Sequence, residues 1–133
     1  MRTIQVIMGV AIVVFIILLF AGSPRQRAPR YNVATEASVR GVVEQIQEFY
    51  CPISGDEGTH LLVRTESGTI QVHVAPRRFL QSNHFSFAKG DQIEVVGSQV
   101  SYQGAPAVIA REITRGDETF AFRTQSGRPV WAE

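Results

Sequence analysis

GDQIEVVGSQVSYQGAPAVIAREI, residues 90–113, holds two apolar segments on either side of a short turn that contains Gly and Pro. Polar and apolar side chains alternate along residues 92–100, and in residues 107–113 Ile109 and Ile113 alternate with their neighbours and are expected to face a core. A period of two is typical of a strand that buries one face. The stretch therefore predicts a β-hairpin.

Three upstream segments predict strands by the same pattern, at residues 38–49, 60–65 and 70–74. The last two flank a polar turn and predict a second hairpin whose apolar side chains face inwards. Gly41 and Gly97 lie inside two of the predicted strands. A residue without a side chain inside a strand is typical of a sharp bend around a small barrel.

The segment between the third and fourth predicted strands does not alternate. Residues 76–88 carry four large apolar side chains, which suits a short helix or an ordered connection that caps one end of a barrel. A last predicted strand, residues 119–124, directs Phe120 and Phe122 inwards and leads to Trp131. We interpret Trp131 as a lid on the barrel base, with an exposed contact residue as the alternative.

Five strands with a non-strand element between the third and the fourth give the order β-β-β-α-β-β. This order predicts an all-β fold, the five-stranded OB-type Greek-key barrel with a short helix between strands 3 and 4, here followed by an extra C-terminal hairpin. Residues 38–133 are assigned to this one domain, because their number suits a single core.

An uninterrupted apolar run precedes the domain. Residues 6–22 just reach the length that crosses a hydrocarbon core of ~30 Å as a helix, about 17 to 25 residues. A cleaved signal peptide is one alternative, but Leu19 and Pro24 make both possible cleavage sites poor. A buried helix of a soluble fold is the other. Residues 1–23 are therefore predicted to be one transmembrane helix, an uncleaved signal anchor.

Residues 24–37 are polar, rich in Arg and Pro, and predict a flexible linker. Arg25, Arg27 and Arg30 favour a cytoplasmic domain by the positive-inside rule, although a short N-terminal tail is readily translocated. From Tyr31 onwards there are nine basic and twelve acidic side chains, a net charge of −3. This acidity disfavours binding to a phosphate backbone.

The quoted stretch resembles small bacterial OB-fold proteins found behind signal or anchor sequences, through its Gly-Asp turn, its Val-x-Gly bend and the Ala-Arg-Glu end of its last strand. The resemblance spans residues 39–113 and implies a domain outside the cytoplasmic membrane. The layout is also similar to that of the periplasmic haem chaperone of cytochrome c maturation, which attaches haem through a His-x-x-x-Tyr motif. Residues 115–133 contain no His, so no haem role and no cofactor are expected.

Three side chains raise the question of metal or nucleophile chemistry. Cys51, His60 and His73 are of the types that bind zinc or copper, but their spacing matches no metal motif. They are interpreted as isolated polar strand residues and a semi-buried thiol, and no metal is expected. Cys51 has only His60 as a possible base, and Asp56 and Glu57 would keep its thiol protonated. No catalytic residue is assigned, and no enzymatic activity is expected.

The ligand-binding face of this barrel type lies on its second and third strands. The side chains expected to point outwards there, and to bind a ligand, are His60, Arg64, Gln71, His73, Arg77 and Arg78. We expect a membrane-tethered, non-enzymatic binding or accessory module in the bacterial cell envelope, with a protein or peptide partner. The alternative is a single-stranded nucleic-acid-binding domain on the cytoplasmic face, although those strands lack aromatics for stacking. The expected contact regions are residues 51–58 and 123–131.

Overall fold

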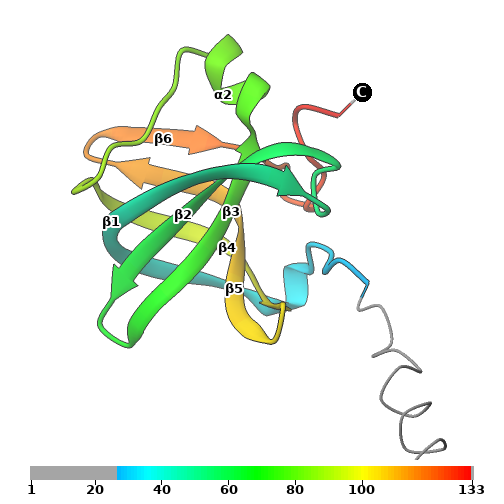
Figure 1. Cartoon of the computed structure of the whole chain (residues 1–133), viewed down its shortest axis with the longest axis horizontal. Coiled ribbons are helices and arrows are strands. Elements are labelled where there is room, and N and C mark those ends of the chain that lie inside the picture. The colour runs from blue at the N-terminus through cyan, green and yellow to red at the C-terminus, as the bar shows by residue number, and fades with distance from the viewer. Residues whose placement is uncertain (1–26, 133) are drawn as a thin grey trace, which may run out of the picture.

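The structure is a computed structural model that describes residues 27–132 (Figure 1). The signal anchor predicted at residues 1–23 lies outside the described residues. Within residues 27–132, no helix is long and apolar enough to cross a membrane.

The described chain contains six strands, with one short α-helix between the third and the fourth, as the sequence predicts (Figure 1). The elements are η1 (Val33–Thr35), β1 (Glu36–Cys51), β2 (Asp56–Thr65), β3 (Gly68–Pro76), α2 (Arg77–Ser82), β4 (Gln92–Tyr102), β5 (Ala105–Arg115) and β6 (Glu118–Ala121).

The strands form one sheet in the order β3-β2-β1-β4-β5-β6, with antiparallel neighbours throughout. β3 also pairs with β5 in parallel over three residue pairs, the last of them His73 with Ile109. This second pairing curls the sheet into a partly closed barrel (Figure 1). Strand order and closure together make the domain OB-like, which confirms the predicted all-β class and the order of its elements.

β1 is long because it pairs with two other strands. Its first part pairs with β4 and its second part with β2, and the change occurs at Gly41 and Val42. A Cβ at Gly41 would overlap the carbonyl oxygen of Arg64. Gly97 has the same relation to the carbonyl oxygen of Ile109, beside a register shift in the β4–β5 ladder. Both predicted bends are therefore places where a second backbone comes too close for a side chain.

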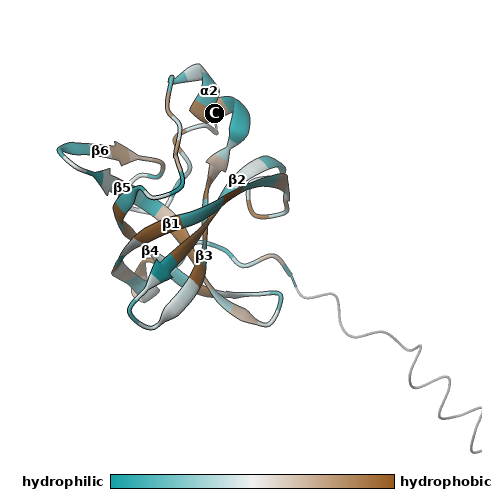
Figure 2. Ribbon diagram, turned by 60° about the vertical axis from the view of Figure 1, so that its left-hand side comes forward, coloured by the Kyte–Doolittle hydropathy of each residue, from teal (hydrophilic) through white to brown (hydrophobic). Residues whose placement is uncertain are grey.

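The core fills the barrel and is closed at one end by the segment that follows α2. Apolar stretches run along the strands, whereas the turn between β5 and β6 is polar (Figure 2). Leu80, Phe85 and Phe87 are buried in this core, as predicted for a capping segment, and Phe122 joins them from the C-terminal side. Trp131 is half-buried and packs against the same core, which confirms its interpretation as a lid.

Several predicted boundaries are wrong. β2 begins at Asp56 because β1 continues to Cys51 and pairs with it, so the predicted loop of residues 51–58 shortens to a four-residue turn at 52–55. Part of the predicted linker, residues 33–37, forms η1 and the start of β1. The predicted C-terminal strand is shorter than expected. β6 pairs with β5, and in the described part of the chain the hairpin continues only as one isolated bridge, Arg123 with Pro129.

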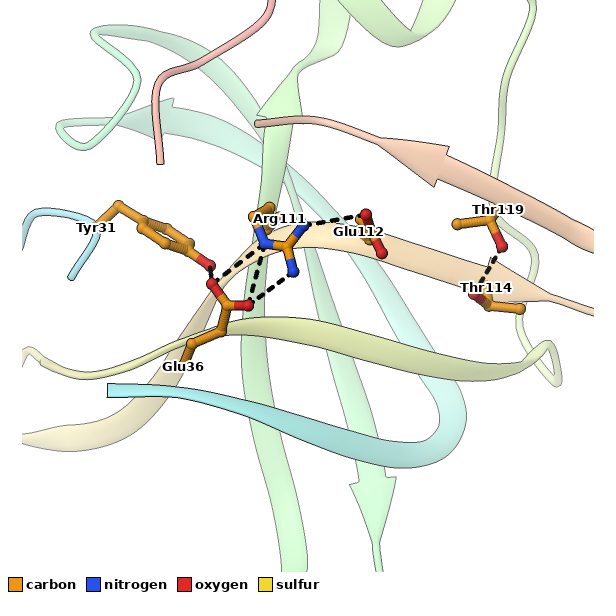
Figure 3. Close-up of polar contacts among 6 residues, drawn as sticks. All are labelled: Tyr31, Glu36, Arg111, Glu112, Thr114 and Thr119. Carbon is orange, nitrogen blue, oxygen red and sulfur yellow. Dashed lines mark hydrogen bonds and ion pairs between the residues drawn. The ribbon is translucent and has the colours of Figure 1, made fainter. Parts of the chain in front are cut away.

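The chain is fastened to the barrel at Tyr31, just before η1 (Figure 3). The Tyr31 hydroxyl donates a 2.6 Å hydrogen bond to Glu36 Oε2, and Arg111 donates three hydrogen bonds to the same carboxylate, the shortest at 2.7 Å. Arg111 also pairs with Glu112 at 3.0 Å. The Tyr31 ring lies where a Cβ of Gly127 would be. Tyr31 therefore fixes the point at which the N-terminal segment leaves the domain.

Candidate functional site

A thiol and two imidazoles meet where β1, β2 and β3 lie side by side. Cys51 is the last residue of β1, and His60 on β2 is the register partner of His73 on β3. One potential ligand atom from each residue, the sulfur of Cys51 and a ring nitrogen of each histidine, lies within 4.8 Å of the other two. All three side chains are buried, with exposed fractions of 3, 0 and 3%. The three residues match no metal motif in the sequence, yet they form a compact cluster in the fold.

Aromatic rings from two other positions cover the histidines. Phe49 of β1 stacks on His60 with centroids 4.0 Å apart and planes at 13°. His60 meets His73 edge to face at 4.6 Å, and His73 meets Tyr102 of β4 in the same way at 4.6 Å. Such pairs stabilise a fold by ~0.5–1.5 kcal/mol each beyond their buried area. Four strands thus contribute one continuous row of rings.

Burial leaves the polar atoms of this cluster poorly satisfied. Among the described residues, His60 Nδ1, His60 Nε2 and His73 Nε2 have no hydrogen-bond partner. The fourth ring nitrogen, His73 Nδ1, lies 3.5 Å from Cys51 Sγ. An unpartnered buried polar group costs about 1–3 kcal/mol. Packing alone therefore does not explain why these nitrogen atoms are buried.

Desolvation also keeps both rings uncharged. Burial lowers the pKa of His60 to about 4. Burial, and after it the neighbouring His60, lowers the pKa of His73 to about 3. Both imidazoles are neutral at physiological pH, the form that offers a lone pair to a metal ion.

Gly58 makes the cluster possible. A Cβ at this position would lie 2.8 Å from Cys51 Cβ and 3.3 Å from His60 Cε1, so any side chain would push the thiol and the ring apart. A residual cavity of about 10 Å³ lies beside the three side chains. It is also lined by Thr59, whose hydroxyl has no hydrogen-bond partner within residues 27–132, and by buried Arg123.

The predicted ligand-binding residues differ in burial and divide into three groups. His60 and His73 are buried, so their prediction as outward-facing residues is wrong; Phe49 and Tyr102 cover the face on which they lie. Gln71 is half-buried. The three arginines are exposed, as predicted, and each is paired: Arg64 with Glu44, Arg77 with Glu48 and Glu57, and Arg78 with Asp56.

These ion pairs change the electrostatic character of the predicted face. The shortest, Arg78 Nε to Asp56 Oδ2, is 2.6 Å long, and the hydrogen bond from Arg78 lowers the pKa of the Asp56 carboxyl. Exposed pairs contribute little to stability. They do neutralise the positive charge that a phosphate backbone requires.

The end of β1 exposes two aromatic side chains that the sequence reasoning left outside the site. Phe49 and Tyr50 are 37% and 67% exposed and lie next to the turn at residues 52–55. Aromatic side chains are enriched at protein interfaces. Phe49 also stacks on His60, so this exposed rim adjoins the buried cluster.

The fold and this site define a small OB-like β-barrel with an aromatic rim over a buried thiol–imidazole cluster. A sequence profile described as "MamS/MamX magnetosome protein family" matches residues 35–120. The chain belongs to this family. No curated protein matches the sequence.

A solved structure, "Crystal structure of S. pombe Stn1-ten1 complex", is 14% identical and aligns over 62% of this chain with a TM-score of 0.47. The aligned region spans 59% of that structure's chain.

Proposed function

We propose that this chain is a membrane-tethered, non-enzymatic accessory module of the magnetosome, placed in the bacterial cell envelope, that binds a protein partner. The observation that carries the binding role is the exposed aromatic pair Phe49 and Tyr50 at the rim of the barrel. Family membership supports the association with the magnetosome. The apolar run at residues 6–22 supports the tether.

The attachment of Tyr31 to the barrel supports a short tether. The eight residues from Pro24 to Tyr31 span at most about 26–29 Å when fully extended. A domain held so close to a bilayer meets an anchored partner at a high effective concentration. Weak contacts through a small aromatic rim are then sufficient for binding.

The charges on the strand-two and strand-three face favour a protein partner over the alternative, single-stranded nucleic acid. Arg64, Arg77 and Arg78 are each paired with a carboxylate. The chain from Tyr31 onwards carries a net charge of −3. A nucleic-acid groove instead combines free cations with stacking aromatics.

One experiment tests both the membrane tether and the side of the membrane on which the domain lies. It uses cells that express the full chain with Ser126→Cys. Ser126 is exposed in the C-terminal turn, whereas the native Cys51 is buried, so the unmodified chain is the matched control. We expect the protein to stay in the membrane pellet after alkaline extraction. We also expect a membrane-impermeant maleimide to label Ser126→Cys in intact cells. Release into the soluble fraction, or labelling only after lysis, would contradict the proposal.

A further inference from the structure

We propose that Cys51, His60 and His73 form a binding site for one transition-metal ion of borderline or soft character, held by a thiolate and two imidazoles. This inference goes beyond the proposed function and does not depend on it. The ligand types are those that bind zinc and copper in proteins, and the three residues lie on three neighbouring strands.

The distances fit such a site. With metal–sulfur and metal–nitrogen bonds of about 2.3 and 2.0–2.1 Å, the sulfur and nitrogen of a tetrahedral site are about 3.6 Å apart. Cys51 Sγ and His73 Nδ1 are 3.5 Å apart, close to that edge. The set of donor atoms spans no more than 4.8 Å, so bringing His60 to the ion requires a closure of about 1–1.5 Å at most. A rotation of the His60 ring against Phe49 is enough for such a shift.

The unpartnered nitrogens argue against a purely packing role. Phe49 stacks on His60 as it would on a phenylalanine, and the contact between His60 and His73 needs no nitrogen atom. Apolar rings at both positions would avoid the cost of three unpartnered buried nitrogens. A metal ion gives a partner to one lone pair of each ring and so explains why imidazoles occupy these positions.

Binding of the metal ion releases one proton, from the Cys51 thiol. The Cys51 S–H bond breaks, its proton passes to solvent, and the sulfur lone pair bonds to the ion, while each neutral imidazole donates one nitrogen lone pair. Arg123 lines the same cavity and places a positive charge near the three side chains. The same charge favours a monovalent ion such as Cu(I), whose complex with one thiolate is neutral. For Zn(II), the Thr59 hydroxyl, which lines the cavity and has no hydrogen-bond partner among the described residues, is a candidate for a further oxygen ligand.

The turn at residues 52–55 provides the route for an ion. Ile53 and Ser54 from this turn line the cavity beside the cluster. One backbone hydrogen bond, from Gly55 N–H to the Cys51 carbonyl at 2.8 Å, closes the turn. Residues 52–55 lie outside the strands, so an opening of this turn leaves the β1–β2 ladder in place.

The test uses the full chain, purified in detergent under reducing conditions and loaded separately with Cu(I) and Zn(II). Bound metal per chain is measured after desalting, and Co(II) serves as a spectroscopic probe for thiolate ligation. Cys51→Ala removes the sulfur, and His73→Phe removes the nitrogens while keeping an aromatic ring. His84→Asn is the matched control, because His84 is the third histidine, is exposed, and has a positive φ of 53° that Asn tolerates.

We expect one Cu(I) or Zn(II) ion per chain for the native protein and for His84→Asn, with a thiolate-to-cobalt charge-transfer band. Cys51→Ala and His73→Phe should each weaken binding by tenfold or more while circular dichroism shows an intact fold. The ion that binds more tightly identifies the preferred metal. Two results would overturn the proposal: a folded native chain that binds none of these ions, or equal binding by all four proteins, which would indicate an adventitious ion only.

Discussion

His60 and His73 are register partners across the β2–β3 ladder, and their rings meet edge to face with centroids 4.6 Å apart and planes at 88°. Two polar rings are therefore buried on the face of these strands that lies opposite the core residues Leu61 and Val72. Their unpartnered nitrogens lower the free energy of unfolding of the metal-free protein. Such a local cost is expected at a functional site, here the proposed metal site.

Replacing His60 by Phe in the metal-free protein should leave the free energy of unfolding unchanged or raise it by about 1 kcal/mol. The new ring keeps the stacking on Phe49 and removes two unpartnered nitrogens. His60→Ala should lower the free energy of unfolding by about 3 kcal/mol, because it leaves a cavity. Urea denaturation compares the two variants. A loss in His60→Phe as large as in His60→Ala would show that the imidazole itself stabilises the fold.

Gly58→Ala should lower the free energy of unfolding by about 1–3 kcal/mol, since the new methyl group would lie 2.8 Å from Cys51 Cβ. It should also weaken metal binding, because the thiol and the His60 ring are pushed apart. Glu57→Ala next to it is the control and should change stability by about 0.5 kcal/mol or less, as Glu57 is exposed. Equal melting curves for the two variants would disprove the close contact at Gly58.

The Glu36 carboxylate should make folding stability depend on acid pH. Hydrogen bonds from Arg111, and next from Tyr31, lower the pKa of Glu36 below its ordinary value of 4.5. The unfolded chain then binds more protons, so this contribution is complete above pH 4.5 and is lost as the pH falls through the folded-state pKa. The difference in melting temperature between the native chain and Glu36→Gln should therefore shrink from pH 6 to pH 3. A constant difference over this range would rule out the linkage.

Trp131→Ala should lower the melting temperature by several degrees. Trp131 packs against the core, with its ring 5.8 Å from that of Phe79 and 5.2 Å from the Arg123 guanidinium. A loss of 1 kcal/mol corresponds to roughly 4–8 °C in a domain of this size. The neighbouring Val130 is 44% exposed, so Val130→Ala should change little. An unchanged melting temperature of Trp131→Ala would contradict the role of a lid and favour the alternative, a residue that contacts a partner.

Much of the fold follows from local pattern, because alternation and turn residues act over a few positions. The hairpin of residues 90–113, the bend at Gly41 and the capping role of Phe85 and Phe87 are all of this kind. Strand ends were missed where pairing, not composition, decides them, as at Asp56.

The candidate site could not be predicted in the same way. Its cysteine and two histidines lie nine and thirteen positions apart in the sequence, and the register of three strands brings them together. Of the rings that cover them, Phe49 lies on β1 two residues before Cys51, whereas Tyr102 comes from β4, a further stretch of the chain. Alternation correctly placed the histidines away from Leu61 and Val72, but no local pattern reveals that this second face is covered.

Site-specific photo-crosslinking at the aromatic rim tests the binding role most directly. A photoreactive amino acid replaces Tyr50 in the full chain in its native cells, and the same group at exposed Glu66, at the far end of the β2–β3 ladder, is the control. We predict one discrete membrane-associated protein crosslinked from position 50 and not from position 66, with the yield reduced by Phe49→Ala. No crosslinked protein from position 50, or the same proteins from both positions, would contradict a binding module that uses this rim.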